Sequence, residues 1–526
     1  MIIYQIYPRS FFDSNGDGIG DLPGILKKIP YVAELGVDAI WISPFFSSPM
    51  RDFGYDISDY RGVAPQFGTV DDFVRIVTES HRYGLKVFID QVWGHSSDQH
   101  PWFQESRSSR DNPKSDWYIW SDPKSDGYYP NNWLSIFGGP AWTWNSLRQQ
   151  YYLHHFLSSQ PAFNLRNKEA VAALLEDAWF WVERGVDGIR VDAIPHYLVD
   201  EKLRSNPPLK RGKESTSFTA AANPRNLQDN KYTECLPDLL PWIEECRAFF
   251  VNRGKDVILL GEIMTGGIGY AGKCVKGRKR LQTAYTGELI GSDISSKRIM
   301  EILGEVNATF DHPSKMCLSL GNHDVSRLFS RIVSKAKDSE KRWRLLVSWY
   351  FTLEGNLCWY QGDELGLSEA EIPYELIQDP FGKAFWPEFK GRDGCRTPMP
   401  WNCGDERGGF TSSTNPWLPI PKDHLECAVD SQNGEAKLSY LRSLLHLRRH
   451  EVALRDGSLE ICKGLPEEVV GYFRVAGKQK ALCLFNFSEE KTVDLSFSIK
   501  EVIKSSDVTA GDMVSIGPNG FIISRV

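Results

Sequence analysis

The sequence predicts an α/β protein built on a closed (β/α)8 TIM barrel, with a subdomain inserted after the third strand and a C-terminal antiparallel β-sandwich. Three observations support this prediction. Short apolar runs alternate with helical patterns over most of the chain, one connection is far too long for a turn, and the pattern changes near residue 455. Eight strands separated by helices favour a closed parallel barrel over a doubly wound sheet.

The predicted strands are short apolar runs bounded by polar residues. Between them, helical stretches such as residues 71–83 and 168–184 repeat apolar side chains three and four positions apart. The strands are expected at residues 2–7, 37–43, 85–92, 186–194, 257–263, 283–290, 316–320 and 356–360.

The domain boundaries follow from two departures from this alternation. About seventy residues separate the third strand from the helix that begins near residue 168, and a structureless loop of that length is uncommon in a compact domain. After a helix at 438–454, short alternating segments such as 469–475 and 480–486 indicate a separate β domain. We therefore expect the barrel in residues 1–95 and 165–455, an inserted subdomain B in 96–164, and the β-sandwich domain in 456–526.

The composition is that of an ordinary globular protein. The 526 residues are 41% hydrophobic and 25% charged, and the net charge of −7 argues against general nucleic-acid binding, which needs a basic surface. No apolar run of about 18 residues predicts a membrane span, and the first residues lack a signal-peptide pattern. The 10 cysteines include no CxxC pair and favour a reducing compartment. We expect a cytoplasmic protein with no organic cofactor, no nucleic-acid partner and no membrane partner.

Four of the apolar runs end at a carboxylate or at polar residues beside one. Because the carboxyl ends of barrel strands meet at one rim, where barrel enzymes keep their active sites, these side chains should converge. The alternative is that each residue caps the helix after its strand, and this explanation weakens as more strand ends share the feature. The residues are Asp90 with His95 nearby, Asp192 after Arg190, Glu262, and Asp324 after Asn322 and His323.

A rim of carboxylates without basic phosphate clamps suits glycoside hydrolysis. One carboxylate attacks the anomeric carbon, and a second, whose pKa is raised, protonates the leaving oxygen. Arg190 should lie on the same side of its strand as Asp192 and keep that carboxylate ionised. Glu262 follows an apolar run, so partial desolvation should raise its pKa and suit it to act as the acid.

Six motifs follow one another along the chain. They are YQIYPRS at 4–10, DQVWGH at 90–95, GIRVD at 188–192, GE at 261–262, NHD at 322–324 and RTPMPW at 396–401. In this order they resemble the motifs of the α-amylase family, and most closely its α-glucosidase and oligo-1,6-glucosidase branch. The resemblance implies that Asp192 is the nucleophile, Glu262 the general acid/base, and Asp324 a third carboxylate that grips sugar hydroxyls and favours the transition state.

The same resemblance implies which residues hold the sugar. Asp52 and Arg396 match a pair that closes the pocket around a terminal glucose, which implies attack at the chain end. Tyr55 matches an aromatic residue that stacks on that glucose, although residues 54–56 also fit a simple turn. Further matches are His95 and His323 at the cleavage subsite and Arg190 beside the nucleophile.

A metal loop is indicated near the N-terminus by oxygen-bearing residues at every second position from 13 to 21. The twelfth position of this loop is Gly24, so the glutamate of an EF-hand is missing. The alternative is a polar, glycine-rich turn without a metal. The resemblance implies a structural Ca²⁺ or Mg²⁺ held by Asp13, Asn15, Asp17 and Asp21, with the carbonyl of Ile19.

Linkage preference depends on Ala193, which follows the expected nucleophile. In the family, Val at this position accompanies α-1,6 cleavage and Ala or Thr accompanies α-1,4 cleavage, because a smaller side chain opens the adjacent subsite. Four positions depart from the family pattern without removing a carboxylate, so we expect activity with an altered rate or second sugar. They are Gly94, Ala162, Ile189 and Gly287.

The sequence thus predicts a retaining, exo-acting α-glucosidase that releases glucose from the non-reducing end of short α-glucosides, with α-1,4 linkages favoured. The partner is a small oligosaccharide or glucoside, and the oligomeric state stays open. One alternative is a transglucosylase, or a sucrose isomerase or hydrolase, with the same machinery. A more distant alternative is a non-catalytic transporter subunit, which would need a membrane helix near the N-terminus and lost carboxylates.

Overall fold

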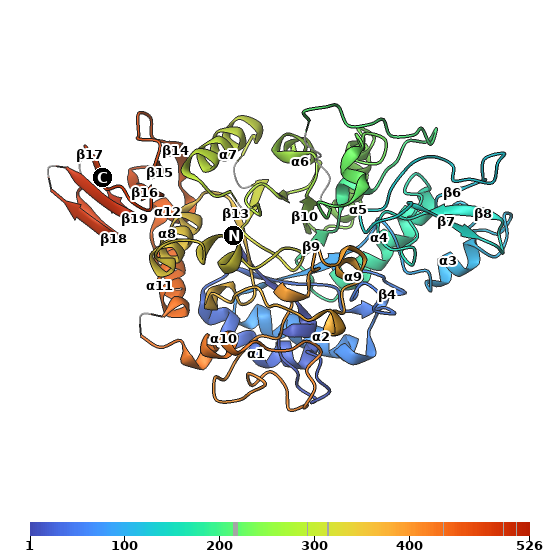
Figure 1. Ribbon diagram of the computed structural model, residues 1–526, viewed down its shortest axis with the longest axis horizontal. Helices are drawn as coiled ribbons and strands as arrows, with labels where there is room; N and C mark the ends of the chain where they lie inside the picture. The colour runs from blue at the N-terminus through green and yellow to red at the C-terminus, as the bar shows by residue number, and fades with distance from the viewer. Residues whose placement is uncertain (214–218, 292, 313–314, 435, 498, 512) are drawn as a thin grey trace.

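The computed structural model describes residues 1–213, 219–291, 293–312, 315–434, 436–497, 499–511 and 513–526. At its centre is a closed barrel of parallel strands in the order β1-β13-β12-β11-β10-β9-β5-β2 (Figure 1). All eight predicted strands are confirmed, each within a few residues of its expected ends. They are β1 (Ile2–Ile6), β2 (Ala39–Ile42), β5 (Lys86–Gln91), β9 (Gly188–Val191), β10 (Ile258–Ile263), β11 (Thr283–Thr286), β12 (Met316–Ser319) and β13 (Asn356–Tyr360).

The barrel strands are buried on both faces, which explains why they are continuous apolar runs rather than alternating patterns. Ile3, Trp41, Phe88 and Leu260 belong to one cluster of side chains from neighbouring strands, which fills the barrel. The predicted helices at 71–83 and 168–184 are confirmed as α2 and α4. Around the strands lie α1 (Leu22–Leu35), α2 (Val70–Arg82), α4 (Lys168–Val182), α5 (Leu239–Asn252), α6 (Gly267–Val275), α7 (Ser296–Thr309) and α8 (Ser339–Thr352).

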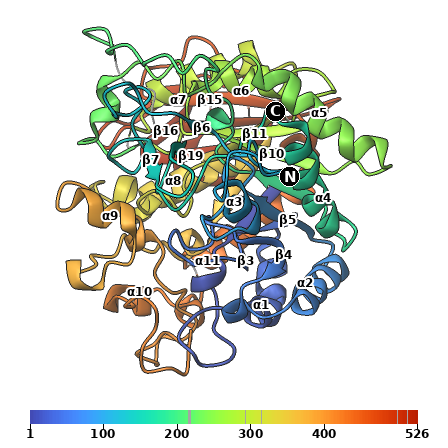
Figure 2. The same cartoon turned by 90° about the vertical axis from the view of Figure 1, so that its right-hand side faces the viewer.

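The segment after β5 contains α3 (Pro101–Ser106) and a small antiparallel sheet in the order β6-β8-β7. Figure 1 shows this sheet at one end of the molecule, and Figure 2 views it from that side. A second long connection, between β9 and α5, packs against it: Asn131 Nδ2 donates to Leu203 O (3.0 Å) and Trp133 Nε1 to Arg204 O (2.9 Å). The strands are β6 (Trp120–Ser121), β7 (Trp142–Asn145) and β8 (Gln150–Leu153).

Shorter elements complete the rim and the link to the C-terminal domain. A hairpin of β3 (Phe46–Ser47) and β4 (Asp59–Val63) follows β2, while α9 (Pro380–Phe385) and α10 (Lys422–Glu426) lie in the long segment after β13. The chain then forms α11 (Lys437–His450) and α12 (Val452–Asp456) before it enters the last domain.

The predicted C-terminal antiparallel β domain is confirmed, and it lies at the end of the molecule opposite the β6-β8-β7 sheet (Figure 1). Its strands join in the order β14-β15-β16-β19-β17, with β18 paired to β19. All ten cysteines of the chain are free, and Cys317, Cys358 and Cys483 are buried as their apolar surroundings predict. Among the described residues, no helix has the length and apolar character that crossing a bilayer requires. The strands are β14 (Ser458–Ile461), β15 (Val469–Ala476), β16 (Gln479–Asn486), β17 (Val493–Leu495), β18 (Glu501–Ala510) and β19 (Val514–Arg525).

Candidate active site

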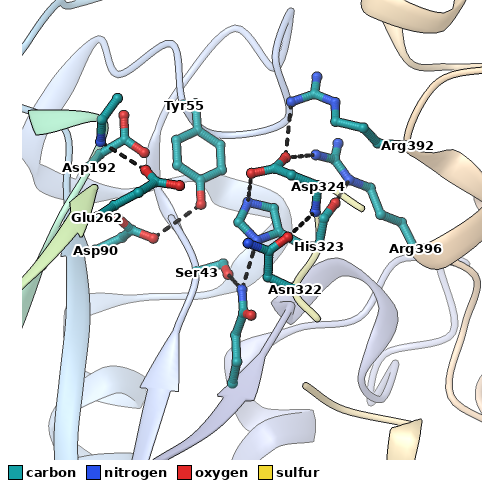
Figure 3. A network of polar contacts seen from close by, with 12 residues as sticks. Ser43, Tyr55, Asp90, Asp192, Glu262, Asn322, His323, Asp324, Arg392 and Arg396 are labelled. Carbon is teal, nitrogen blue, oxygen red and sulfur yellow. Dashed lines mark hydrogen bonds and ion pairs between the residues drawn. The ribbon is translucent and has the colours of Figure 1, made fainter. Parts of the chain in front are cut away.

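The predicted carboxylates meet at the carboxyl ends of the barrel strands. Asp90 and Glu262 lie near the ends of β5 and β10, Asp192 directly follows β9, and Asp324 lies in the loop after β12. Figure 3 shows Asp192 and Glu262 on one side of the Tyr55 ring, and Asp324 on the other. The rim that the strand ends predict is therefore present.

Arg190 joins three of these carboxylates from below the pocket and is fully buried. Its Nη1 lies 2.5 Å from Asp192 Oδ1 and 2.7 Å from Asp90 Oδ1, while its Nη2 lies 2.6 Å from Glu262 Oε2. The Tyr285 hydroxyl accepts a further hydrogen bond from Nη2 (2.8 Å). One guanidinium thus fixes the positions of both expected catalytic carboxyls.

The ionisation of this group differs from the expectation for Asp192. Burial raises the pKa of Asp192 to about 7 and outweighs the opposing charge of Arg190. Burial likewise raises the pKa of Glu262 to about 7, as the apolar run before it predicts, and that of Asp90 to about 6. A single guanidinium cannot neutralise three buried carboxyls, so the group holds protons near neutral pH and titrates as a unit.

Ala193 has a backbone conformation that a non-glycine residue rarely adopts. It lies in the left-handed region, with φ 39° and ψ 40°, directly after the expected nucleophile. In this conformation its N–H donates to Glu262 Oε2 over 2.8 Å. The strained residue therefore also positions the expected acid.

The predicted pairing of Asp52 with Arg396 is wrong, because the partner of Asp52 is Arg392. Arg392 Nη2 lies 2.7 Å from Asp52 Oδ1. Asp379 accepts hydrogen bonds from Arg392 Nε (3.1 Å) and Nη2 (2.8 Å), and so orients the guanidinium towards the pocket. Arg396 instead donates to Asp324 Oδ1 (2.8 Å) and to the carbonyl of His323 (2.7 Å).

Asp324 is surrounded by positive charge. Arg392 Nη1 approaches the same Oδ1 atom that Arg396 contacts, at 3.2 Å. Burial favours the protonated form of Asp324, but the electrostatic interactions with His323 first, and then with the two arginines, prevail and hold its pKa below the usual range. Asp324 is therefore a permanent anion, in contrast to the Asp192 and Glu262 pair.

The remaining predicted sugar-binding residues gather around Tyr55. Its ring stacks on His323 with centroids 5.3 Å apart, and its hydroxyl donates to Asp90 Oδ2 (3.1 Å). His95 Nε2 lies 3.0 Å from the carbonyl of Tyr55. Gln160, which sequence reasoning missed, places its Nε2 3.0 Å from Asp52 Oδ2 and 3.2 Å from His95 Nε2.

A pocket of about 720 Å³, partly open to solvent, lies over these groups. Arg190, His323 and Arg396 do not line it and lie behind its surface. Sequence analysis missed the apolar lining residues, because they come from the inserted segment, the β10–α6 loop and the region after β13. The lining comprises Asp52, Tyr55, His95, Asp192, Ala193, Glu262, Asp324 and Arg392, together with Ile136, Phe137, Phe156, Pro195, His196, Met264 and Phe381.

Two of the departures from the family pattern lie in tightly packed surroundings. A Cβ on Gly94 would lie 3.1 Å from the Tyr197 ring, which fills the space that a larger side chain would need. Ala162 is buried, and its backbone pairs with that of His95. Neither position alters the carboxylates.

The predicted metal loop forms a compact turn before α1. Asp13 Oδ1 accepts from the N–H groups of Asn15 (3.0 Å) and Gly16 (2.7 Å), and Asp21 caps α1 by accepting from Gly24 N (2.6 Å). Burial, together with the charge of Asp13, raises the pKa of Asp21.

The donor set of this loop fits a hard cation only in part. Asp13 and Asp21 are buried carboxylates, and no ion pair among the described residues involves either of them. The described chain also contains no group of three or more His, Cys, Asp or Glu side chains arranged around a metal position. Oxygens of Asn15, Asp17 and the Ile19 carbonyl would have to complete the coordination.

Comparisons with known proteins agree on one family. Residues 5–457 match the profile "Alpha amylase, catalytic domain". The chain is 47% identical to a "Probable alpha-glucosidase" of Rhizobium meliloti, over 93% of this chain and 89% of the relative. It is 32% identical to an oligo-1,6-glucosidase of Parageobacillus thermoglucosidasius, over 94% and 90%.

Solved structures give the same result. An α-glucosyl transfer enzyme, XgtA, superposes with a TM-score of 0.94 at 43% identity and covers 100% of this chain and 98% of its own. The trehalulose synthase MutB of Pseudomonas mesoacidophila superposes with a TM-score of 0.89 at 30% identity, over 100% and 98%.

Proposed function

Because the chain belongs to the α-amylase family, we propose that it is a retaining α-glucosidase that removes glucose from the non-reducing end of short α-glucosides. Asp192 attacks the anomeric carbon, and Glu262 protonates the leaving oxygen. Glu262 then removes a proton from the water that hydrolyses the glucosyl ester. Substrate is a small oligosaccharide or glucoside.

Retention is supported by the short connection between the two carboxyls. Both carboxyls contact Arg190, and the N–H of Ala193, the residue after Asp192, donates to Glu262 Oε2. Retaining glycosidases keep their carboxyls about 5–5.5 Å apart, whereas inverting enzymes need about 6.5–9.5 Å to admit a water. The arrangement fits direct attack by Asp192.

Attack at the chain end is supported by the Asp52–Arg392 ion pair, which is the observation that carries the proposal. Both side chains line the pocket and are at least nine-tenths buried. Together with Asp324 and His95 they offer hydrogen-bonding groups to one sugar ring. A polymer that continues past this ring would have to displace a buried ion pair, which is costly.

We propose α-1,4 linkages as the preferred ones because Ala193 leaves room beside the nucleophile. Transfer of glucose to a sugar acceptor is the second candidate, since two of the structural neighbours are named as a glucosyl transfer enzyme and a trehalulose synthase. The same covalent intermediate serves both outcomes, and only the acceptor differs. A structural Ca²⁺ or Mg²⁺ held by the loop at Asp13–Asp21 is part of the proposal, supported by the two buried carboxylates of that loop, which have no ion-pair partner among the described residues.

The test is a product assay with maltose, isomaltose, sucrose, trehalose and maltotetraose. The proposal expects α-glucose as the first anomer in proton NMR, and glucose with maltotriose as the only early products from maltotetraose. First-formed β-glucose would exclude retention, and early maltose from maltotetraose would exclude attack at the chain end. Asp192→Asn should abolish turnover while circular dichroism stays unchanged.

A further inference from the structure

His323 is held by side chains from the first of the six sequence motifs, residues 4–10, which the proposed reaction does not use. The Tyr7 ring stacks on the imidazole, with centroids 5.7 Å apart and 22° between the planes. Gln5 Nε2 lies 2.7 Å from His323 Nδ1. Gln5 and His323 are both fully buried, so bulk water does not compete for this contact. The motif therefore fixes the plane of the ring and the surroundings of one of its nitrogens.

The hydrogens of the Gln5 amide determine which His323 nitrogen carries the proton. One N–H of Nε2 donates to Ser43 Oγ (3.1 Å), and the other faces His323 Nδ1. Because the amide nitrogen can only donate, Nδ1 accepts with its lone pair, and the proton of a neutral imidazole then lies on Nε2. Burial favours the neutral ring and lowers the pKa of His323 to about 3. In Figure 3 the ring lies between Ser43 and Asp324.

The opposite orientation of the Gln5 amide is less favourable. With Oε1 and Nε2 exchanged, the oxygen would accept from Ser43 and from a proton on His323 Nδ1. The amide nitrogen would then occupy the place of Oε1, which is buried with no partner among the described residues, and would leave two N–H groups unsatisfied instead of one oxygen. The lone pair of His323 Nε2 would also face Asp324 Oδ2 over 3.4 Å, which is repulsive.

From this network we propose that Gln5 is a positioning residue, which fixes the neutral His323 ring with its proton on Nε2, the nitrogen that faces Asp324 Oδ2. Arg392 and Arg396 both contact the other oxygen of Asp324, Oδ1. The inference rests on the proposed function, in which Asp324 grips sugar hydroxyls and favours the transition state. Gln5 does not line the pocket and acts only through His323.

The direct test is 15N NMR of the wild-type enzyme labelled at histidine, with the His323 signals identified by their loss in His323→Gln. A nitrogen that carries a proton and a nitrogen with a lone pair resonate at well-separated 15N shifts, so the spectrum reports the tautomer. Near neutral pH we expect the proton on Nε2. A proton on Nδ1 would overturn the inference, whatever the activity of the enzyme.

Gln5→Glu should make the tautomer depend on pH. At low pH the new carboxyl and the ring share an additional proton, and Nε2 keeps its own proton whichever group holds the additional one. At high pH the additional proton is lost, the remaining one lies between the carboxylate and Nδ1, and Nε2 turns a lone pair to Asp324. The kcat of the variant relative to the wild type should therefore fall as pH rises.

This ratio isolates the new carboxyl, because the other titratable groups that face the ring are the same in both proteins. They are Asp324, Arg190, Arg392 and Arg396, with the phenols of Tyr7 and Tyr55 stacked on the ring. The His323 15N shifts of the variant should move from the Nε2–H form to the Nδ1–H form over the same pH range. A ratio that stays constant from about pH 5 to about pH 9 would overturn the inference.

Gln5→Met keeps the length of the side chain and removes the amide. The kcat for maltose should fall by about 5–10-fold, the effect of about one hydrogen bond, and KM should change less because Asp324 acts in the transition state. Gln282→Met is the matched control. Its amide, half-buried directly before β11 at the amino ends of the strands, accepts from Leu259 N (2.9 Å) and donates to Val257 O (2.6 Å).

Gln282→Met should lower the melting temperature without changing kcat or the His323 15N shifts. Equal losses of kcat in the two methionine variants would overturn the role of Gln5. If the wild type hydrolyses no α-glucoside, the proposed function fails, and the NMR spectrum still decides whether Gln5 fixes the tautomer.

Discussion

Replacement of Arg392 by Met tests the ion pair that closes the pocket. The guanidinium contacts Asp52, Asp379 and Asp324, and the side chains of Arg392, Asp52 and Asp379 are 7%, 4% and 0% exposed. Met keeps most of the length of the side chain but leaves Asp52 and Asp379 as buried anions that have lost their main cation. The change therefore isolates the charge and its hydrogen bonds.

The expected loss follows from this burial. Removing one partner of a buried ion pair destabilises a protein by about 3–5 kcal/mol, which urea unfolding would report. Hydrogen bonds to charged groups contribute about 1.5–3 kcal/mol each, so kcat/KM for maltose should fall by about 10–100-fold. In the double variant with Asp52→Asn, the losses should overlap by about 1–3 kcal/mol because both changes remove the same contact.

Two controls show whether Arg392 is the specific partner. Arg407→Met breaks an exposed pair with Asp405, of side-chain exposures 39% and 30%, and should cost less than about 1 kcal/mol. Arg396→Met should overlap little with Asp52→Asn, because Arg396 contacts Asp324 instead. If the Arg392 and Asp52 effects simply add, or if Arg396 overlaps with Asp52 more strongly, the assignment made from the geometry is refuted.

Four further predictions concern the acid, the pH profile, the linkage and the metal. Glu262→Gln should slow maltose hydrolysis by about 10²–10⁴-fold and a nitrophenyl glucoside much less, and equal losses would contradict its role as acid. Because burial raises the pKa of Asp192 and of Glu262 to about 7, kcat/KM should peak near pH 7, falling at lower pH as the pair loses its anion and at higher pH as it loses its proton. With the nitrophenyl substrate, Glu262→Gln should keep only the acid limb. Ala193→Val should raise the ratio of kcat/KM for isomaltose to kcat/KM for maltose, by an amount worth at most about 1–3 kcal/mol. An unchanged ratio would mean that other residues, such as those at 367–389, determine the linkage preference. Chelation should lower the melting temperature if the loop at Asp13–Asp21 binds an ion, and no shift would favour a metal-free turn.

The same pKa shifts have a consequence for stability. The pKa of Glu262 is about 7 in the folded chain against 4.5 for an exposed glutamate, so the unfolded chain releases this proton first as pH rises. The stabilising effect of the protonated carboxyl is therefore complete below about pH 4.5 and is lost as pH rises through about 7. Near neutral pH, burial of the Glu262 carboxyl therefore lowers the free energy of unfolding relative to more acidic conditions.

The sequence alone determined the barrel and the carboxyls at its rim. Both are local features: a buried parallel strand is a short apolar run, and Asp192 or Glu262 at its end is readable without knowing any neighbour. The alternation of strands with helices such as α2, which begins with a Thr69–Asp72 capping box, fixed the order of elements. Eight such units favour a closed parallel barrel over a doubly wound sheet, the other compact arrangement of parallel strands and helices.

Only the tertiary structure decided the pairing and the lining of the pocket. Arg392 and Arg396 are four residues apart in one loop, so the sequence does not show which of them contacts Asp52. In the structure, hydrogen bonds to Asp379 hold Arg392 in the position that contacts Asp52. Gln160, Phe137 and Phe381 come from separate segments whose meeting depends on how long loops fold over the barrel. The pKa of Asp192 was also decided there, because the expected effect of Arg190 is local while burial is a property of the whole pocket.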